Sequence, residues 1–68
     1  MEFSRSVEMH VYKITVVEHY TGRITEVQVT DHNEDHAHFM ARNKARMAGF
    51  SFPVVEKCEI VRTFVQHY

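Results

Sequence analysis

Residues 30–50 constrain the fold most, because this one stretch carries signals for the start, the middle and the end of a helix. Asp31 is a residue type that accepts hydrogen bonds from first-turn N–H groups, and Glu34 three residues later completes a capping box. Gly49 suits the left-handed position that closes many helices. These signals predict a single helix over residues 33–48.

One face of this helix is predicted to pack on a sheet. Its apolar residues recur in steps of three and four, which is typical of an amphipathic helix. The predicted buried stripe consists of Ala37, Met40, Ala41, Lys44, Met47 and Ala48. Small alanine side chains allow a close approach to the sheet, and Lys44 is expected at the margin of the stripe with its ammonium group in water.

The other segments are rich in β-branched and aromatic residues, which predicts strands. Residues 7–18 and 24–30 flank a turn at Gly22 and form a predicted hairpin, and residues 54–64 form a third strand.

Alternation along these strands predicts which side chains share a face. In the first strand, Val7, Met9 and Val11 share one face, and Tyr12, Ile14 and Val16 share the other. This change of phase indicates a bulge, or a strand covered on both faces. In the third strand, Cys58 and Ile60 are grouped with Phe64, and Val55 is grouped with Val61 and Val65.

The order of the elements predicts an α+β fold, β-β-α-β, with a three-stranded antiparallel sheet in the order 2-1-3 and the helix packed on one face. Residues 1–68 form a single predicted domain, and residues 1–6 are a candidate disordered end. The second face of the sheet has no expected cover. The apolar patch predicted on that face consists of Tyr12, Val16, Val61 and Val65. A small core and an uncovered face favour a homodimer, formed through this face or through strand edges.

Composition narrows the possible functions. A net charge of −1 gives no general attraction to nucleic acid or to an anionic membrane, and the apolar runs are too short to span one. The single cysteine, Cys58, suits a reducing compartment, so we expect a cytoplasmic protein. The cysteine alternates with apolar residues, which favours an inert buried thiol. No catalytic or cofactor motif stands out, and we expect neither enzymatic activity nor a cofactor.

A set of positions between residues 26 and 58 matches a known pattern without a gap. The set consists of Glu26, Val27, Asp35, Ala37, Ala41, Ala48, Gly49, Phe50, Val55 and Cys58. In these positions the chain resembles the small RNA polymerase inhibitors of T7-like lytic phages, which have the same order of elements. Where that family has a pair of arginines on its third strand, this chain has Val54 and Glu56. The resemblance implies a small phage-type protein that binds and modulates a complex in the host cytoplasm, with RNA polymerase as the named candidate.

Three histidines lie in an acidic setting near the predicted helix start: His32, His36 and His38. His32 and His36 are four residues apart, a spacing that metal sites use, whereas His38 is expected to point roughly the opposite way. A third ligand would have to be Asp31, Asp35 or a residue of another chain. The favoured interpretation is a solvated polar turn without a metal. The alternatives are a metal site at His32 and His36, or a surface that responds to pH.

An aromatic ring among charges suggests a protein-binding surface. Phe39 lies off the predicted buried stripe, and such a ring resembles the centre of a binding patch. The leading prediction is a protein-interaction module that binds and modulates a host enzyme complex. The predicted partner-binding residues are Phe39, Asp35, Arg42 and Arg46 on the helix, and Lys57 and Arg62 on the third strand. The alternatives are a small nucleic-acid-binding protein, which would use the basic residues of the helix, and a structural homo-oligomer.

Overall fold

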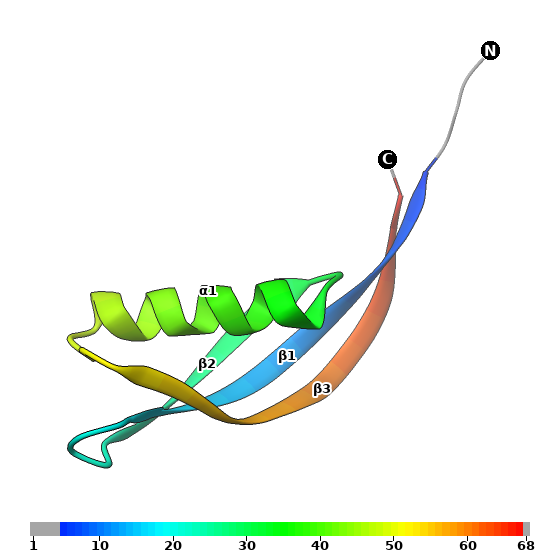
Figure 1. The fold of residues 1–68 in the computed structure, drawn as a ribbon. Coiled ribbons are helices and arrows are strands. Elements are labelled where there is room, and N and C mark those ends of the chain that lie inside the picture. The colour runs from blue at the N-terminus through cyan, green and yellow to red at the C-terminus, as the bar shows by residue number, and fades with distance from the viewer. Residues whose placement is uncertain (1–4, 68) are drawn as a thin grey trace.

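The computed structural model describes residues 5–67 and has the predicted order of elements (Figure 1). The elements are β1 Ser6–Glu18, β2 Ile24–Asp31, α1 Glu34–Met47 and β3 Pro53–His67. The strands form one antiparallel sheet in the order β2-β1-β3, so β1 is central, and α1 lies on one face. The α+β prediction is therefore confirmed. Residues 1–4 of the candidate disordered end lie outside the described residues, and Ser6 already belongs to β1.

Local hydrogen bonds define where α1 begins. The N-cap is Asn33, whose side-chain oxygen accepts a hydrogen bond from the His36 N–H at 3.1 Å. The prediction that Asp31 caps the helix is wrong. Asp31 Oδ1 instead accepts hydrogen bonds from the N–H groups of His32 and Asn33, so the carboxylate stabilises the turn that precedes the helix.

The C-terminal end of α1 has the predicted glycine stop. Gly49 has a φ of 102°, a conformation that side chains with a Cβ rarely adopt. The Phe50 N–H donates to the Ala45 carbonyl and the Gly49 N–H donates to the Arg46 carbonyl, both at 3.0 Å. This pattern is a Schellman motif, and it turns the buried Phe50 ring back toward the core.

The buried face of α1 is narrower than the predicted stripe. It consists of Ala37, Ala41 and Ala45, spaced four residues apart. Met47 is 90% exposed, and Lys44 lies at the margin, where its Nζ donates to the Gln28 carbonyl at 3.3 Å. Alanines hold the helix close to the sheet along one line, and Met40 beside that line is partly buried against the core.

The centre of the sheet supplies the other half of the core. Tyr12, Ile14 and Val16 of β1 are buried beneath α1, together with Val29 of β2. The prediction of Tyr12 and Val16 on the uncovered face is therefore wrong. β1 keeps one alternation from Tyr12 to Glu18, so its even-numbered residues face α1 and its odd-numbered residues face away.

The expected irregularity lies in the pairing of β1 with β3, where β3 supplies the extra residues. Val11 pairs with Arg62 while Tyr12 pairs with Ile60, which leaves Val61 as an additional residue. Between Thr15 and Val16 the partner changes from Lys57 to Val55, which leaves Glu56 as a second one. Each additional residue reverses the alternation of β3.

These bulges change the predicted faces of β3. Val55, Cys58 and Ile60 pair with core residues of β1 and so lie on the α1 side, whereas Phe64 pairs with Met9 on the other side. Grouping Phe64 with Cys58, and separating Val55 from Cys58, were both wrong predictions for this reason. Of the predicted exposed patch, Val61 and Val65 are indeed exposed, but they do not form one surface with Tyr12 and Val16.

The molecule is elongated, with principal extents of 55 × 19 × 15 Å. Beyond the end of β2, β1 and β3 continue as a two-stranded ribbon toward the termini, uncovered by α1 (Figure 1). Among the described residues, no helix has the length and apolar character needed to cross a membrane.

Candidate functional site

The predicted partner-binding residues lie on two opposite sides of the molecule. Phe39 is 49% exposed, and Asp35, Arg42 and Arg46 project from the same outer face of α1. Lys57 and Arg62 pair with odd-numbered residues of β1, which places them on the sheet face away from α1. The structure therefore separates the predicted set into two groups that cannot contact one small surface of a partner.

The Phe39 ring lies roughly parallel to the His36 imidazole, with the ring centroids 6.3 Å apart and an interplanar angle of 19°. Phe39 lies on the outer face of α1, roughly opposite the alanine stripe. The expected exposure of Phe39 is thus confirmed, and its role in binding remains a prediction.

An apolar surface of several side chains, larger than the single Phe39 ring and not predicted, lies at the hairpin end of the sheet. Val17 pairs with Ile24 on β2 and with Val54 on β3, so the three side chains form a row across the uncovered face. The row borders a shallow open cavity of about 380 Å³, which His19 and Glu56 also line. Ile24, in this row, is 65% exposed, whereas isoleucine side chains are usually buried.

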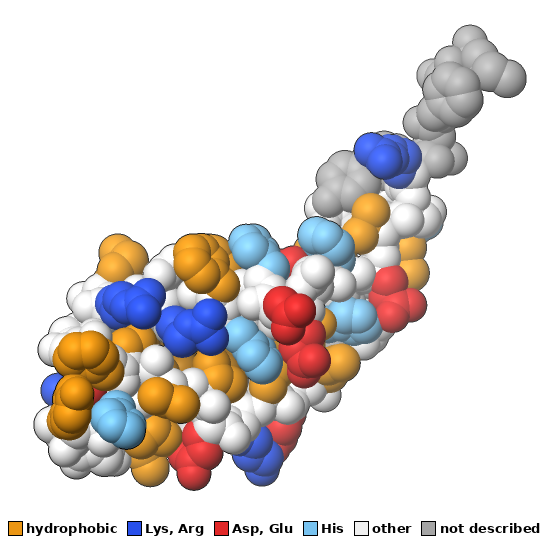
Figure 2. All heavy atoms as spheres, in the orientation of Figure 1, with side chains coloured by type: hydrophobic (Ala, Val, Ile, Leu, Met, Phe, Trp, Pro, Cys, Tyr) orange, Lys and Arg blue, Asp and Glu red, His pale blue; other side chains and the backbone are white. Residues whose placement is uncertain are grey.

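Two aromatic rings extend this surface around the end of the molecule. The exposed Tyr20 and Phe52 rings meet edge to face with their centroids 5.0 Å apart. We refer to Val17, Tyr20, Ile24, Phe52 and Val54 as the hairpin-end patch. Figure 2 shows hydrophobic side chains gathered at this end, where the β1–β2 turn and the α1–β3 loop meet.

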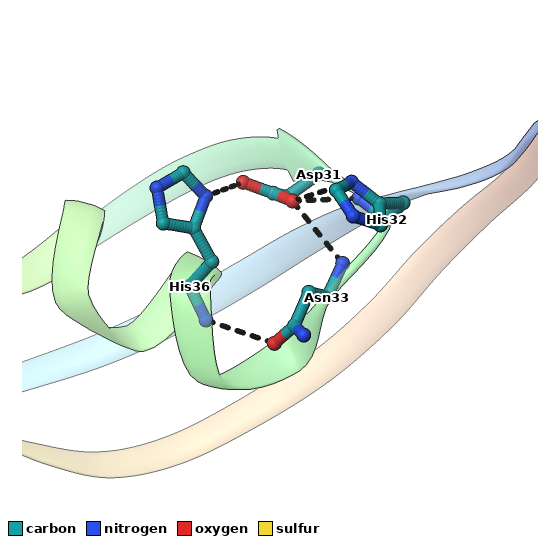
Figure 3. A network of polar contacts seen from close by, with 4 residues as sticks. All are labelled: Asp31, His32, Asn33 and His36. Carbon is teal, nitrogen blue, oxygen red and sulfur yellow. Dashed lines mark hydrogen bonds and ion pairs between the residues drawn. The ribbon is translucent and has the colours of Figure 1, made fainter.

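A buried carboxylate organises the start of α1 (Figure 3). Asp31 Oδ2 accepts a hydrogen bond from His36 Nδ1, and Oδ1 lies 3.2 Å from His32 Nδ1. His32 and His36, the alternative metal pair of the sequence analysis, are therefore each turned toward a different oxygen of one carboxylate. Burial raises the pKa of the Asp31 carboxyl, but the His36 hydrogen bond and the two backbone N–H groups outweigh it and hold the pKa below its usual range.

Replacing Asp31 by asparagine is expected to destabilise the protein by roughly 1–2 kcal/mol at neutral pH. A carboxyl whose pKa is lowered by folding stabilises the fold above its unfolded pKa of about 4, and this contribution is lost as the pH falls through the lower folded value. Urea unfolding of both proteins between neutral pH and about pH 3 measures their free energies of unfolding. The difference between the two free energies should decrease as the pH falls. A difference that stays constant with pH would show that the carboxylate charge does not contribute to stability.

His38 faces β3, away from His32 and His36, as its position on the helix predicted. Its Nε2 lies 4.0 Å from Glu34 Oε1, and one ligand atom from each of Glu34, His38 and Cys58 lies within 4.8 Å of the other two. Cys58 is half-buried, in contrast to the expected buried thiol. The sequence does contain the four-residue spacing of Glu34 and His38, but the approach of Cys58 depends on the bulged register of β3.

Comparison of the chain with protein-family models, with characterised proteins and with solved structures found no significant match. The resemblance to the phage polymerase inhibitors therefore remains a prediction.

Proposed function

We propose that this protein is an interaction module that docks on a host enzyme complex, with bacterial RNA polymerase as the candidate partner, and that the hairpin-end patch is its main docking surface. The observation that carries the proposal is the row Ile24, Val17 and Val54 on the uncovered sheet face, bordered by two exposed aromatic rings. Contiguous apolar surface of this kind is typical of binding sites. RNA polymerase as the candidate comes from the resemblance over residues 26–58.

The chemistry of the patch favours a protein partner over nucleic acid. Phosphate binding requires a group of free cations, whereas the cavity at the patch is lined by three aliphatic side chains, a histidine and Glu56. Burial of apolar surface depends little on salt, so binding should fall only slightly as the salt concentration rises. A steep fall would instead support the nucleic-acid alternative.

Ile24→Thr is expected to weaken binding to purified bacterial RNA polymerase by about tenfold, because burial of the exposed part of this side chain at an interface contributes roughly 1–2 kcal/mol. Threonine keeps the β-branched shape, so the strand should persist. The measurement is the dissociation constant from titration of labelled protein with polymerase. The matched control is Ile60→Thr, the same exchange at a residue that is 55% exposed on the opposite sheet face.

A third variant, Phe39→Ala, distinguishes the patch from the outer face of α1. The ring is half-exposed, so its removal should leave the thermal midpoint nearly unchanged. Weakened binding for Phe39→Ala with unchanged binding for Ile24→Thr would move the docking surface to α1. Failure of the parent protein to bind polymerase would reject this candidate partner.

A further inference from the structure

We propose that Glu34, His38 and Cys58 bind one divalent transition-metal ion, with zinc as the best chemical match. This proposal is independent of the docking function.

The backbone already places the three ligands on facing surfaces. Glu34 and His38 are one helical turn apart, so their side chains leave α1 on the same side. Cys58 pairs with the fully buried Ile14, which directs its thiol toward α1. Ligand atoms in a tetrahedral zinc site are separated by roughly 3.3–3.6 Å, given bond lengths of about 2.0–2.3 Å. The 4.0 Å between His38 Nε2 and Glu34 Oε1 would close to this range by small side-chain rotations.

One atom of the cluster lacks a partner in the metal-free protein. His38 Nε2 is buried and has no hydrogen-bond partner among the described residues. A buried polar atom without a partner is costly, and such atoms call for a specific explanation. Coordination to a metal ion would supply the partner, because neutral imidazole binds zinc through this nitrogen.

The donor set selects the class of ion. One sulfur, one nitrogen and one carboxylate oxygen suit zinc, whereas calcium and magnesium prefer oxygen ligands alone. A thiolate and a carboxylate together balance the charge of a divalent ion. Glu34 is exposed, so a solvent-facing fourth position remains for water.

The surroundings of Cys58 show how metal binding would couple to protons. Burial raises the pKa of the Cys58 thiol, and the charge and hydrogen bond of Glu34 raise it further. The thiol therefore keeps its proton in the metal-free protein. The sulfur would give up this proton as it forms its bond to the ion.

Titration of tag-free, reduced protein with Co²⁺ tests the site, because a cobalt–thiolate bond gives a near-ultraviolet charge-transfer band and tetrahedral cobalt gives strong visible bands. We expect both, saturating at one ion per chain, and a higher thermal midpoint with Zn²⁺. Cys58→Ser should abolish the charge-transfer band. His38→Gln should keep the band but weaken affinity at least tenfold. His32→Gln and His36→Gln are the controls, and they should leave cobalt binding unchanged.

Circular dichroism of each metal-free variant checks that it is folded. If Cys58→Ser is unfolded, the cobalt affinity of His38→Gln decides the result. Absence of the charge-transfer band in the parent protein would overturn the proposal. So would cobalt binding that is lost in His32→Gln or His36→Gln but retained in His38→Gln.

Discussion

Replacing Ala41 by aspartate is expected to leave the chain unfolded at room temperature. Ala41 is 0% exposed and lies on the line where α1 contacts the sheet. An aspartate there would have to bury a carboxylate without a partner, or bury it protonated, and would also force additional atoms into a packed site. The combined cost is several kcal/mol, comparable with the total stability of about 3–5 kcal/mol that a core of this size provides.

The measurement is the far-ultraviolet circular dichroism spectrum and its thermal midpoint. Asn43→Asp is the control, because it adds the same charge to α1 at a half-buried position and keeps an oxygen that can accept the Arg46 hydrogen bond. A folded Ala41→Asp protein with an unchanged midpoint would show that this face of α1 does not pack on the sheet.

Glu18→Ala is expected to destabilise the protein by roughly 2–4 kcal/mol, well above the loss expected for an exposed charged residue. The buried Glu18 carboxylate accepts hydrogen bonds from the Ser51 N–H at 2.6 Å and from the Phe52 N–H at 3.1 Å. It thereby attaches the α1–β3 loop to the end of β1. Alanine would leave two backbone N–H groups without their acceptor.

Urea unfolding measures this loss, with Glu18→Gln and Glu26→Ala as comparisons. Glutamine keeps one acceptor oxygen and should cost less than alanine. Glu26 is exposed and paired with Lys13 at 3.4 Å, so its removal should change stability by no more than about 1 kcal/mol. Equal losses of stability for Glu18→Ala and Glu26→Ala would contradict the attachment of the α1–β3 loop by Glu18.

The helix and the strands could be predicted because their signals are local. The glycine stop at Gly49 and the alternation of Val27 and Val29 depend only on neighbouring residues. The predicted N-cap, Asp31, lies two residues before the actual one, Asn33. Both residue types are good caps, and the choice between them depends on how the chain leaves β2.

The hairpin-end patch and the faces of β3 could not be predicted from alternation. The bulges at Glu56 and Val61 reverse the phase of β3, and a bulge is defined by the partner strand and not by its own sequence. Val54 therefore joins Ile24 on a surface that the chain alone does not reveal. The loop contacts of Glu18 likewise join residues more than thirty positions apart.

The docking proposal is tested most directly by photo-cross-linking. A photoreactive aromatic amino acid replaces Tyr20 in one protein and Phe39 in another, and each is irradiated with purified bacterial RNA polymerase. Tyr20 lies in the hairpin-end patch and Phe39 on the outer face of α1, so the two positions report on different surfaces. We predict a cross-link from position 20 that excess unlabelled protein suppresses. A cross-link from position 39 alone, or none from either position, would contradict docking through the hairpin-end patch.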